Sequence, residues 1–180
     1  MKIALFLTLA RIGAIPLLVV ILLSHIRGRE VLSFAIFFLA TLTDMLDGFF
    51  ARQKKQVTNL GLLLDPTADK LLVASVLICL VQTRVVPAWM AIIIIGRELA
   101  VSGFRAIASA RGINIPASFL GKAKMILEAF TIYVLLLGEK ILGSFYAIGR
   151  VGLWLVILVA LGSAAEYCWR FGRSVLSTHT

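Results

Sequence analysis

The chain has 180 residues, of which 61% are hydrophobic and 15% are charged, whereas a soluble domain of this length is about half apolar and a quarter charged. So large an apolar fraction cannot be buried inside one small globule, because a domain of this size leaves much of its surface in water. The net charge of +9 comes from basic residues dispersed at the ends of hydrophobic runs, which favours anionic lipids and phosphates over nucleic acid as partners. The composition therefore indicates an integral membrane protein.

Apolar runs recur along the whole chain, and a helix that crosses a bilayer needs about 20 apolar residues. In chain order, we expect transmembrane helices at residues 3–23, 31–50, 67–82, 87–107, 123–138 and 148–167. The first run lacks the cleavage site of a signal peptide and is long enough to span. Only short joints separate the runs, so we expect residues 1–180 to form a single transmembrane domain. The predicted fold class is all-α, a polytopic integral membrane protein with six transmembrane helices.

Basic residues are divided unevenly between the two ends of these helices. Only five of the 18 fall on the side opposite the termini: Arg27, Arg29, Arg84, Lys140 and Arg150. The positive-inside bias therefore places both termini in the cytoplasm, as in a protein of the cytoplasmic (inner) membrane. The charged residues within the expected helices also fall toward the cytoplasmic end. This favours one polar cavity that opens inward, whereas a transporter places its site near the midplane.

All four aspartates of the protein lie between positions 44 and 69. Asp44 and Asp47 are three residues apart, and Asp65 and Asp69 are four apart, so each pair shares a helix face. The short joint between the two helices makes them antiparallel neighbours, and the pairs are then expected to face each other at one depth. Four carboxylates in a poorly solvated site cannot all stay ionised without compensation. The pattern predicts hard divalent cations, Mg²⁺, Mn²⁺ or Ca²⁺, and suits two ions that clamp a phosphate-bearing substrate.

Small residues accompany the aspartates. Gly48, Ala51 and Gly61 each lie one helical turn from an aspartate and leave the acidic face without bulk, as the approach of a large ligand requires. The same small residues would also let two membrane helices pack closely. Arg52, one turn after Gly48, either binds a diphosphate or neutralises an aspartate.

In order, these residues read Asp44-x2-Asp47-Gly48-x2-Ala51-Arg52-x8-Gly61-x3-Asp65-x3-Asp69. This resembles the signature of the CDP-alcohol phosphotransferase family, D-x2-D-G-x2-A-R-x8-G-x3-D-x3-D, at all eight fixed positions and in every gap. The resemblance implies a six-helix membrane enzyme, a homodimer, in which an alcohol displaces CMP from a CDP-linked lipid. It implies that the four aspartates hold two metal ions and that Asp69 is also the base that takes the proton of the acceptor. It further implies a CDP-lipid site made by Gly48, Ala51, Arg52 and Gly61.

A basic cluster beyond the signature predicts how the acceptor alcohol is recognised. Its members flank the expected helices at 87–107 and 123–138, and they are Arg97, Arg105, Lys122 and Lys124. Arginine and lysine gathered in a shielded cavity form the expected receptor for a phosphate. The alternative is that these residues are flanking charges of the positive-inside type. We favour a phosphorylated acceptor over serine or free inositol.

Over nearly its whole length the chain also resembles one branch of the family, the bacterial phosphatidylglycerophosphate synthases, for example in Arg97-Glu98 and in residues 65–72 and 121–124. This resemblance implies that the phosphatidyl group of CDP-diacylglycerol passes to glycerol 3-phosphate, with Mg²⁺ or Mn²⁺, to give phosphatidylglycerol phosphate and CMP. The chain departs from the branch at Leu5, Met125 and Glu128, where Asn, Thr, and Gln or Thr are common. The last two border the expected acceptor pocket, and Glu128 is placed to pair with Lys124 one turn away.

Other functions stay open at this stage. Within the same family, the acceptor could be inositol phosphate or phosphatidylglycerol. A divalent-cation transporter could use the same carboxylates, and an intramembrane aspartyl protease would need only two of them. An assay of CMP release with a panel of acceptors separates these possibilities.

Overall fold

The computed structural model describes residues 2–54, 59–110 and 119–176, with side chains described for 8–43, 67–110, 121–166 and 169. The described chain is helical and contains no strand, which confirms the predicted all-α class. Its elements are α1 (Lys2–Leu23), α2 (Arg29–Lys54), α3 (Asn59–Gln82), α4 (Ala88–Ala110), α5 (Phe119–Leu142), the 3₁₀ turn η1 (Gly143–Tyr146) and α6 (Ala147–Leu176).

Two expected helix boundaries are wrong. α3 begins at Asn59 and not at residue 67, because the leucine-rich stretch before Pro66 belongs to the same helix. Proline favours the first turn of a helix, but membrane helices tolerate it further inside. α6 continues to Leu176 beyond the expected end at residue 167, since hydropathy marks only the apolar part of a helix.

α5 loses its regular geometry at Gly138, where the expected helix also ends. The backbone there has φ 72° and ψ 169°, a conformation that glycine adopts at little steric cost. The last residues of α5 and the short η1 then return the chain into α6. A glycine at this position lets the two helices form a close antiparallel pair.

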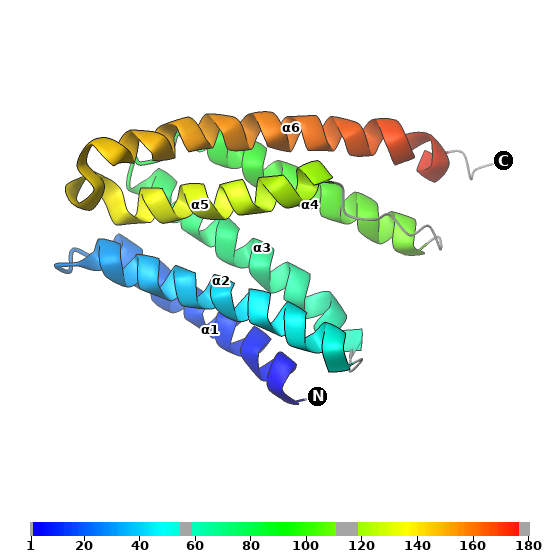
Figure 1. The fold of residues 1–180 in the computed structure, drawn as a ribbon, viewed down its shortest axis with the longest axis horizontal. Helices are drawn as coiled ribbons and strands as arrows, with labels where there is room; N and C mark the ends of the chain where they lie inside the picture. Colours follow the sequence, from blue (N-terminus) through cyan, green and yellow to red (C-terminus); the bar gives the residue numbers. More distant parts are fainter. Residues whose placement is uncertain (1, 55–58, 111–118, 177–180) are drawn as a thin grey trace.

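The bundle consists of two three-helix halves (Figure 1). In one half α1 packs against both α2 and α3, and in the other α6 packs against both α4 and α5. The halves meet where α2 contacts α5 and where α3 contacts α4. Among the described residues α2 and α3 touch each other only slightly. The sequence had suggested α2 as the main neighbour of α3, but the structure shows that it is α1.

One apolar core runs through both halves. Its completely buried members come from all six α-helices and include Leu18, Phe37, Leu72, Ile94, Ile132 and Val156. Tyr133 on α5 forms edge-on or tilted ring contacts with Phe34, Phe37 and Phe38 on α2, and Phe34 stacks on Phe38 within α2. The hydroxyl groups of Tyr133 and Thr41 hydrogen-bond to each other at the same contact, which fixes the two halves against one another.

The outer surface of the bundle is also apolar. Large side chains point away from the core on every long helix, among them Val20, Leu39, Ile78, Ile92, Ile126 and Leu158. Ile92 is 70% exposed and Ile126 is 72% exposed, an arrangement that is costly in water but suits contact with lipid. Within the described residues, one segment has the length and apolar composition of a membrane span, Gly121–Glu166, which includes α5, η1 and α6. Six crossings and the side of the termini stay predictions.

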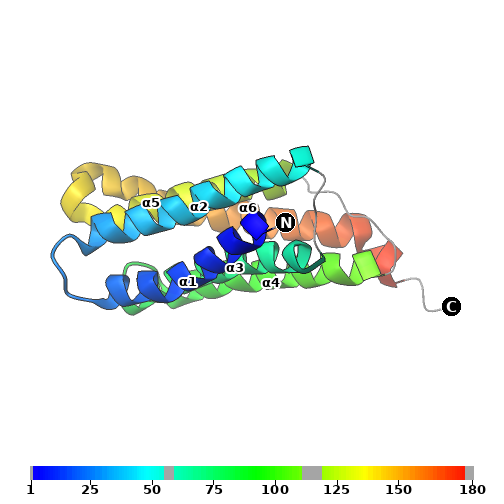
Figure 2. The same ribbon diagram turned by 90° about the horizontal axis from the view of Figure 1, so that it is seen from below.

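Consecutive helices run in opposite directions along the bundle. Consequently α1, α3 and α5 begin, and α2, α4 and α6 end, at the same end of the molecule (Figures 1 and 2). We call this the aspartate end, because α2 and α3 carry all four aspartates toward it. The opposite end, formed by the α1–α2, α3–α4 and α5–α6 connections, is called the far end.

Candidate functional site at the aspartate end

The helices place the predicted site residues along the bundle as expected. Asp44 and Asp47 lie in the second half of α2, and Asp65 and Asp69 lie in the first half of α3. Several predicted side chains lie outside the described residues, namely those of Asp44, Asp47, Gly48, Ala51, Arg52, Gly61 and Asp65. Within the described side chains, no three acidic, histidine or cysteine groups gather as a metal site, and this set includes only Asp69 of the four aspartates. The convergence of the four carboxylates therefore stays a prediction.

Lys124 is the best-defined charged group at this end. Its side chain on α5 is completely buried, and its Nζ lies 2.6 Å from Glu98 Oε1 on α4 and 2.5 Å from Glu128 Oε2 one turn along α5. An unpaired buried ammonium is strongly unfavourable, and two carboxylates with short hydrogen bonds offset that cost. The expected pairing of Lys124 with Glu128 is confirmed, and the pairing with Glu98 adds a link between helices.

Arg97 extends the cluster to α6. Its Nη1 lies 2.5 Å from Glu98 Oε1, and its Nη2 donates a hydrogen bond to the hydroxyl of Ser163 at 2.5 Å. Glu98 therefore receives hydrogen bonds from Arg97 and Lys124 on the same oxygen. We call Arg97, Glu98, Lys124, Glu128 and Ser163 the buried ion cluster, which joins α4, α5 and α6 at the aspartate end.

The buried ion cluster also reaches toward the aspartates. Glu128 lies close enough to Asp69 on α3 for the two negative charges to interact. One carboxylate oxygen of Glu128, Oε1, is buried and has no hydrogen-bond partner among the described residues. Two acidic groups and an unsatisfied carboxylate oxygen in one region favour a bound cation or a hydrogen-bond donor from a ligand.

A further buried cation lies on α1. Arg11 is only 3% exposed, and its Nε donates a hydrogen bond to the carbonyl oxygen of Ala40 on α2, at 3.4 Å. Ala40 is one helical turn before Asp44, so Arg11 brings positive charge toward the acidic part of α2. The sequence marks Arg11 as a costly charge inside an apolar helix, but it does not show which helix it contacts.

The basic residues expected to bind the acceptor fall into two groups. Arg105 on α4 and Lys122 on α5 have exposed side chains at the aspartate end. Arg97 and Lys124 instead have short hydrogen bonds to carboxylates, and their charges are compensated within the protein. Because they are exposed, the side chains of Arg105 and Lys122 are more accessible to a phosphate than those of Arg97 and Lys124.

The sequence does not identify Ser163 as a partner of Arg97, or Glu98 as a partner of Lys124. Ser163 is one small polar residue in an apolar helix, and it lies 66 positions from Arg97. A serine in such a helix is usually bonded to its own backbone or to a neighbouring helix, and Ser163 does both, donating to the carbonyl oxygen of Ala160 at 3.0 Å. Its position as a polar residue within an apolar helix is the signal in the sequence, and the structure shows that its side chain is completely buried.

Together these features define a helical, membrane-associated protein in which buried ionic groups and all four aspartates lie toward one end of an apolar bundle. Comparison with known proteins is consistent with this class. A profile of the CDP-alcohol phosphatidyltransferases matches residues 1–165 of the chain, and the chain belongs to this family.

Curated relatives resemble the chain over most of its length. A protein of Bacillus subtilis named CDP-diacylglycerol–glycerol-3-phosphate 3-phosphatidyltransferase is 39% identical over 174 residues, covering 89% of this chain and 90% of that protein. A protein of the same name from Rickettsia bellii is 35% identical over 164 residues, covering 90% and 91%. A probable phosphatidylglycerophosphate synthase of Mycobacterium tuberculosis is 33% identical over 172 residues, covering 94% and 81%.

Proposed function

We propose that this protein transfers the phosphatidyl group of CDP-diacylglycerol to glycerol 3-phosphate, forming phosphatidylglycerol phosphate and releasing CMP. The observation that carries the proposal is the complete aspartate signature. Its residues lie on α2 and α3, toward the same end of the bundle. The names of the relatives, which match nearly the full chain, support glycerol 3-phosphate as the acceptor.

The family uses divalent metal ions, and the donor set of this chain suits them. We assign Asp44, Asp47, Asp65 and Asp69 to two ions, Mg²⁺ or Mn²⁺, because hard cations prefer carboxylate oxygens. Such ions stabilise negative charge on a diphosphate and on a departing phosphate. The carboxylate oxygen of Glu128 that has no hydrogen-bond partner among the described residues also suits a nearby cation.

The reaction is an in-line displacement at phosphorus. A hydroxyl oxygen of glycerol 3-phosphate forms a bond to the phosphatidyl phosphorus while the bond to the CMP oxygen breaks, and CMP leaves with the electron pair. Asp69 accepts the proton of the attacking hydroxyl, a role that requires it to lie within hydrogen-bond reach of the acceptor.

The CDP-lipid is expected to lie along the acidic faces of α2 and α3. Gly48, Ala51 and Gly61 would leave room for the cytidine diphosphate, and Arg52 would pair with its phosphates. The apolar outer surface of the bundle lets the two acyl chains of the lipid stay in the bilayer while its headgroup reaches the aspartate end.

For the acceptor phosphate we assign direct contacts to Arg105 and Lys122. Arg97 and Lys124, the other two residues expected there, would reach the phosphate only by exchanging a carboxylate for it, which has a large cost in a buried site. Their supported role is to hold α4, α5 and α6 in register, so that Arg105 and Lys122 face the same space.

The proposed setting follows from the charges. The excess of basic residues near the aspartate end supports a cytoplasmic active site in the inner membrane, where CDP-lipid headgroups and glycerol 3-phosphate are both accessible. The homodimer that the family resemblance implies is part of the same proposal.

The deciding experiment measures CMP release by the purified protein with CDP-diacylglycerol, Mg²⁺ and one acceptor at a time. Glycerol 3-phosphate should stimulate CMP release far more than inositol phosphate or phosphatidylglycerol. Equal or greater stimulation by another acceptor would reassign the substrate within the family. Metal flux across proteoliposomes without any nucleotide release would instead indicate a divalent-cation transporter.

A further inference from the structure

A pocket at the far end of the bundle has no part in the proposed reaction. It encloses about 520 Å³ between the α3–α4 connection and the first turns of α6, a volume within the usual range of ligand sites. Its floor is apolar and buried and includes Val86, Met90 and Leu153. Since the aspartates are carried to the opposite end of the bundle, the pocket is a separate site.

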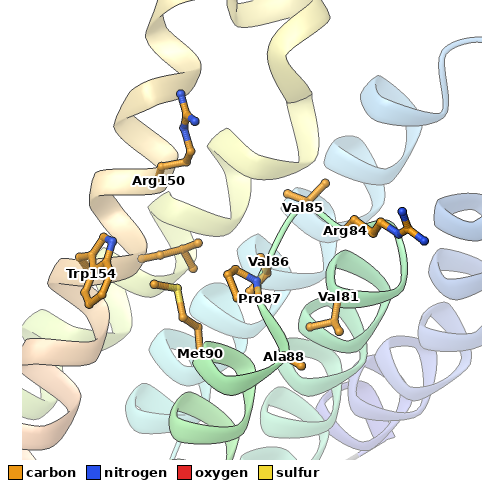
Figure 3. A pocket seen from close by; sticks show the side chains of 10 residues that line it. Val81, Arg84, Val85, Val86, Pro87, Ala88, Met90, Arg150 and Trp154 are labelled. Carbon is orange, nitrogen blue, oxygen red and sulfur yellow. The ribbon is translucent and has the colours of Figure 1, made fainter.

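Two arginines stand at the rim of this pocket. Figure 3 shows Arg150 and Trp154 on α6 at one side and Arg84 on the α3–α4 connection at the other, with the guanidinium of Arg84 directed outward. Both arginines are exposed. Neither has an ion-pair partner among the described side chains, although Arg29 at the same end of the bundle is paired with Glu30. The rim is therefore positively charged without internal compensation.

The backbone at Arg84 is unusual. Arg84 has φ 60°, and its N–H donates to Val81 O while the N–H of Val85 donates to Leu80 O. This is the hydrogen-bond pattern of a Schellman motif, in which the left-handed position is usually glycine. An arginine there carries steric strain that glycine would avoid. The strain places a long cationic side chain at the pocket rim.

Aromatic groups beside the pocket point to a membrane interface. The rings of Trp89 and Trp154 pack with centroids 5.5 Å apart, and both are about half exposed. Tryptophan concentrates where the hydrocarbon of a bilayer meets the headgroups, because its ring is apolar and its N–H is polar. A pocket at this level, with an apolar floor and a cationic rim, is accessible to a lipid from the side.

We propose that this pocket binds one anionic phospholipid of the surrounding leaflet. The lipid phosphate lies at the rim with Arg150 and within the field of Arg84, and the upper part of an acyl chain covers Val86, Met90 and Leu153. A free inorganic phosphate would satisfy the arginines but would leave the apolar floor uncovered. The site is independent of the proposed transferase activity.

The test measures lipid retention by the purified full-length protein, using native mass spectrometry after titration with phosphatidylserine or phosphatidylcholine. Phosphatidylserine is chosen because it takes no part in the proposed reaction. The parent should retain phosphatidylserine in preference to phosphatidylcholine. The substitutions Arg84→Gly and Arg150→Gln should each weaken this retention about fivefold, and the double variant about 30-fold, the effect of removing one or two cations near a membrane surface.

Matched controls separate this pocket from general attraction to a basic protein. Arg27→Gln and Lys140→Gln remove exposed charges at the far end outside the pocket lining and should leave retention unchanged, and Arg84→Lys should retain most of it. Because glycine suits the left-handed position, Arg84→Gly should unfold in lipid-free detergent at a temperature no lower than the parent. Its loss of lipid would then not result from misfolding.

Four results would overturn the proposal. The first is that the double variant retains phosphatidylserine as well as the parent does. The second is that Arg27→Gln loses as much phosphatidylserine as the pocket variants. The third is that inorganic phosphate alone displaces the lipid, which would indicate a free-anion site. The fourth is a parent dimer that excludes lipid and dissociates in the double variant, which would assign the pocket to a second copy of the chain.

Discussion

Lys124 on α5 lies 2.6 Å from Glu98 on α4, so a completely buried ammonium group joins two helices at the aspartate end. The same Nζ is 2.5 Å from Glu128, the residue whose charge interacts with Asp69. A buried charge keeps its partners in place, because separating them exposes each to an apolar environment. The buried ion cluster therefore acts as a rigid support beside the proposed base.

The first prediction concerns the stability of this cluster. Lys124→Met should lower the free energy of unfolding by about 3–5 kcal/mol, since it leaves the buried Glu128 without its cation and Glu98 with Arg97 alone. Adding Glu128→Gln to that variant should recover part of the loss, because the carboxylate that has lost its cation is then neutral. Thermal or denaturant unfolding in detergent measures both effects.

Lys122→Met is the matched control for that prediction. Lys122 is exposed and lies two positions away on the same helix, so its removal should change the stability by less than about 0.5 kcal/mol. If the Lys122 and Lys124 variants were equally stable, Lys124 would not be a structural cation.

The second prediction concerns the base. Asp69→Asn should lower kcat by about 10²- to 10⁴-fold, the usual contribution of a positioned base. Asp69→Asn should weaken binding of CDP-diacylglycerol less than Asp44→Asn does. Because Asp69 is also the proton acceptor, its substitution should affect turnover more than lipid binding. Turnover and lipid binding are measured on the same preparations. Turnover by Asp69→Asn at the parent rate would refute the assignment.

The third prediction concerns the acceptor. Arg105→Ala should raise the KM for glycerol 3-phosphate by about 10- to 150-fold, equivalent to one charged hydrogen bond of about 1.5–3 kcal/mol. Its kcat should change less, and Arg27→Gln at the far end should change neither constant. Steady-state kinetics with varied glycerol 3-phosphate test this directly, and a change in KM of less than twofold would remove Arg105 from the acceptor site.

The fourth prediction concerns the contact between α5 and α6. A Cβ added at Gly152 would lie 2.5 Å from Oγ1 of Thr131 on the neighbouring helix, so Gly152→Ala should destabilise the protein by about 1–3 kcal/mol. Gly103→Ala is the control, because nothing lies within 4 Å of the new methyl group and alanine is favoured over glycine in a helix by about 0.8–1 kcal/mol. If Gly152→Ala were as stable as the parent, α5 and α6 would have to lie further apart than they do in the structure.

The hydropathy pattern predicted every helix, because apolar runs separated by short polar joints permit little else in a membrane. It failed at Asn59 and Leu176, because α3 continues through Gly61, Asp65 and Pro66 and α6 continues through charged residues beyond its apolar part. It also could not show that α1 lies against α3, because the choice of neighbour depends on the shapes of whole helix faces.

Within the site, local contacts were predictable and distant ones were not. Lys124 and Glu128 are one turn apart, so their pairing follows from helix geometry. The links from Lys124 to Glu98 and from Arg97 to Ser163 join residues on different helices. No spacing rule connects such residues, so the sequence did not show that Arg97 is bonded to Ser163 or that Lys124 is bonded to Glu98.

The proposed chemistry depends most on Asp44, Asp47, Asp65 and Asp69 acting together on two cations. Electron paramagnetic resonance of Mn²⁺ titrated into the purified protein with a cytidine nucleotide tests this independently of turnover. The parent should bind two Mn²⁺ ions per chain with a spin-coupled signal, and a variant with all four aspartates changed to asparagine should bind neither. Equal Mn²⁺ binding by the two proteins, or two uncoupled ions in the parent, would contradict a shared metal site.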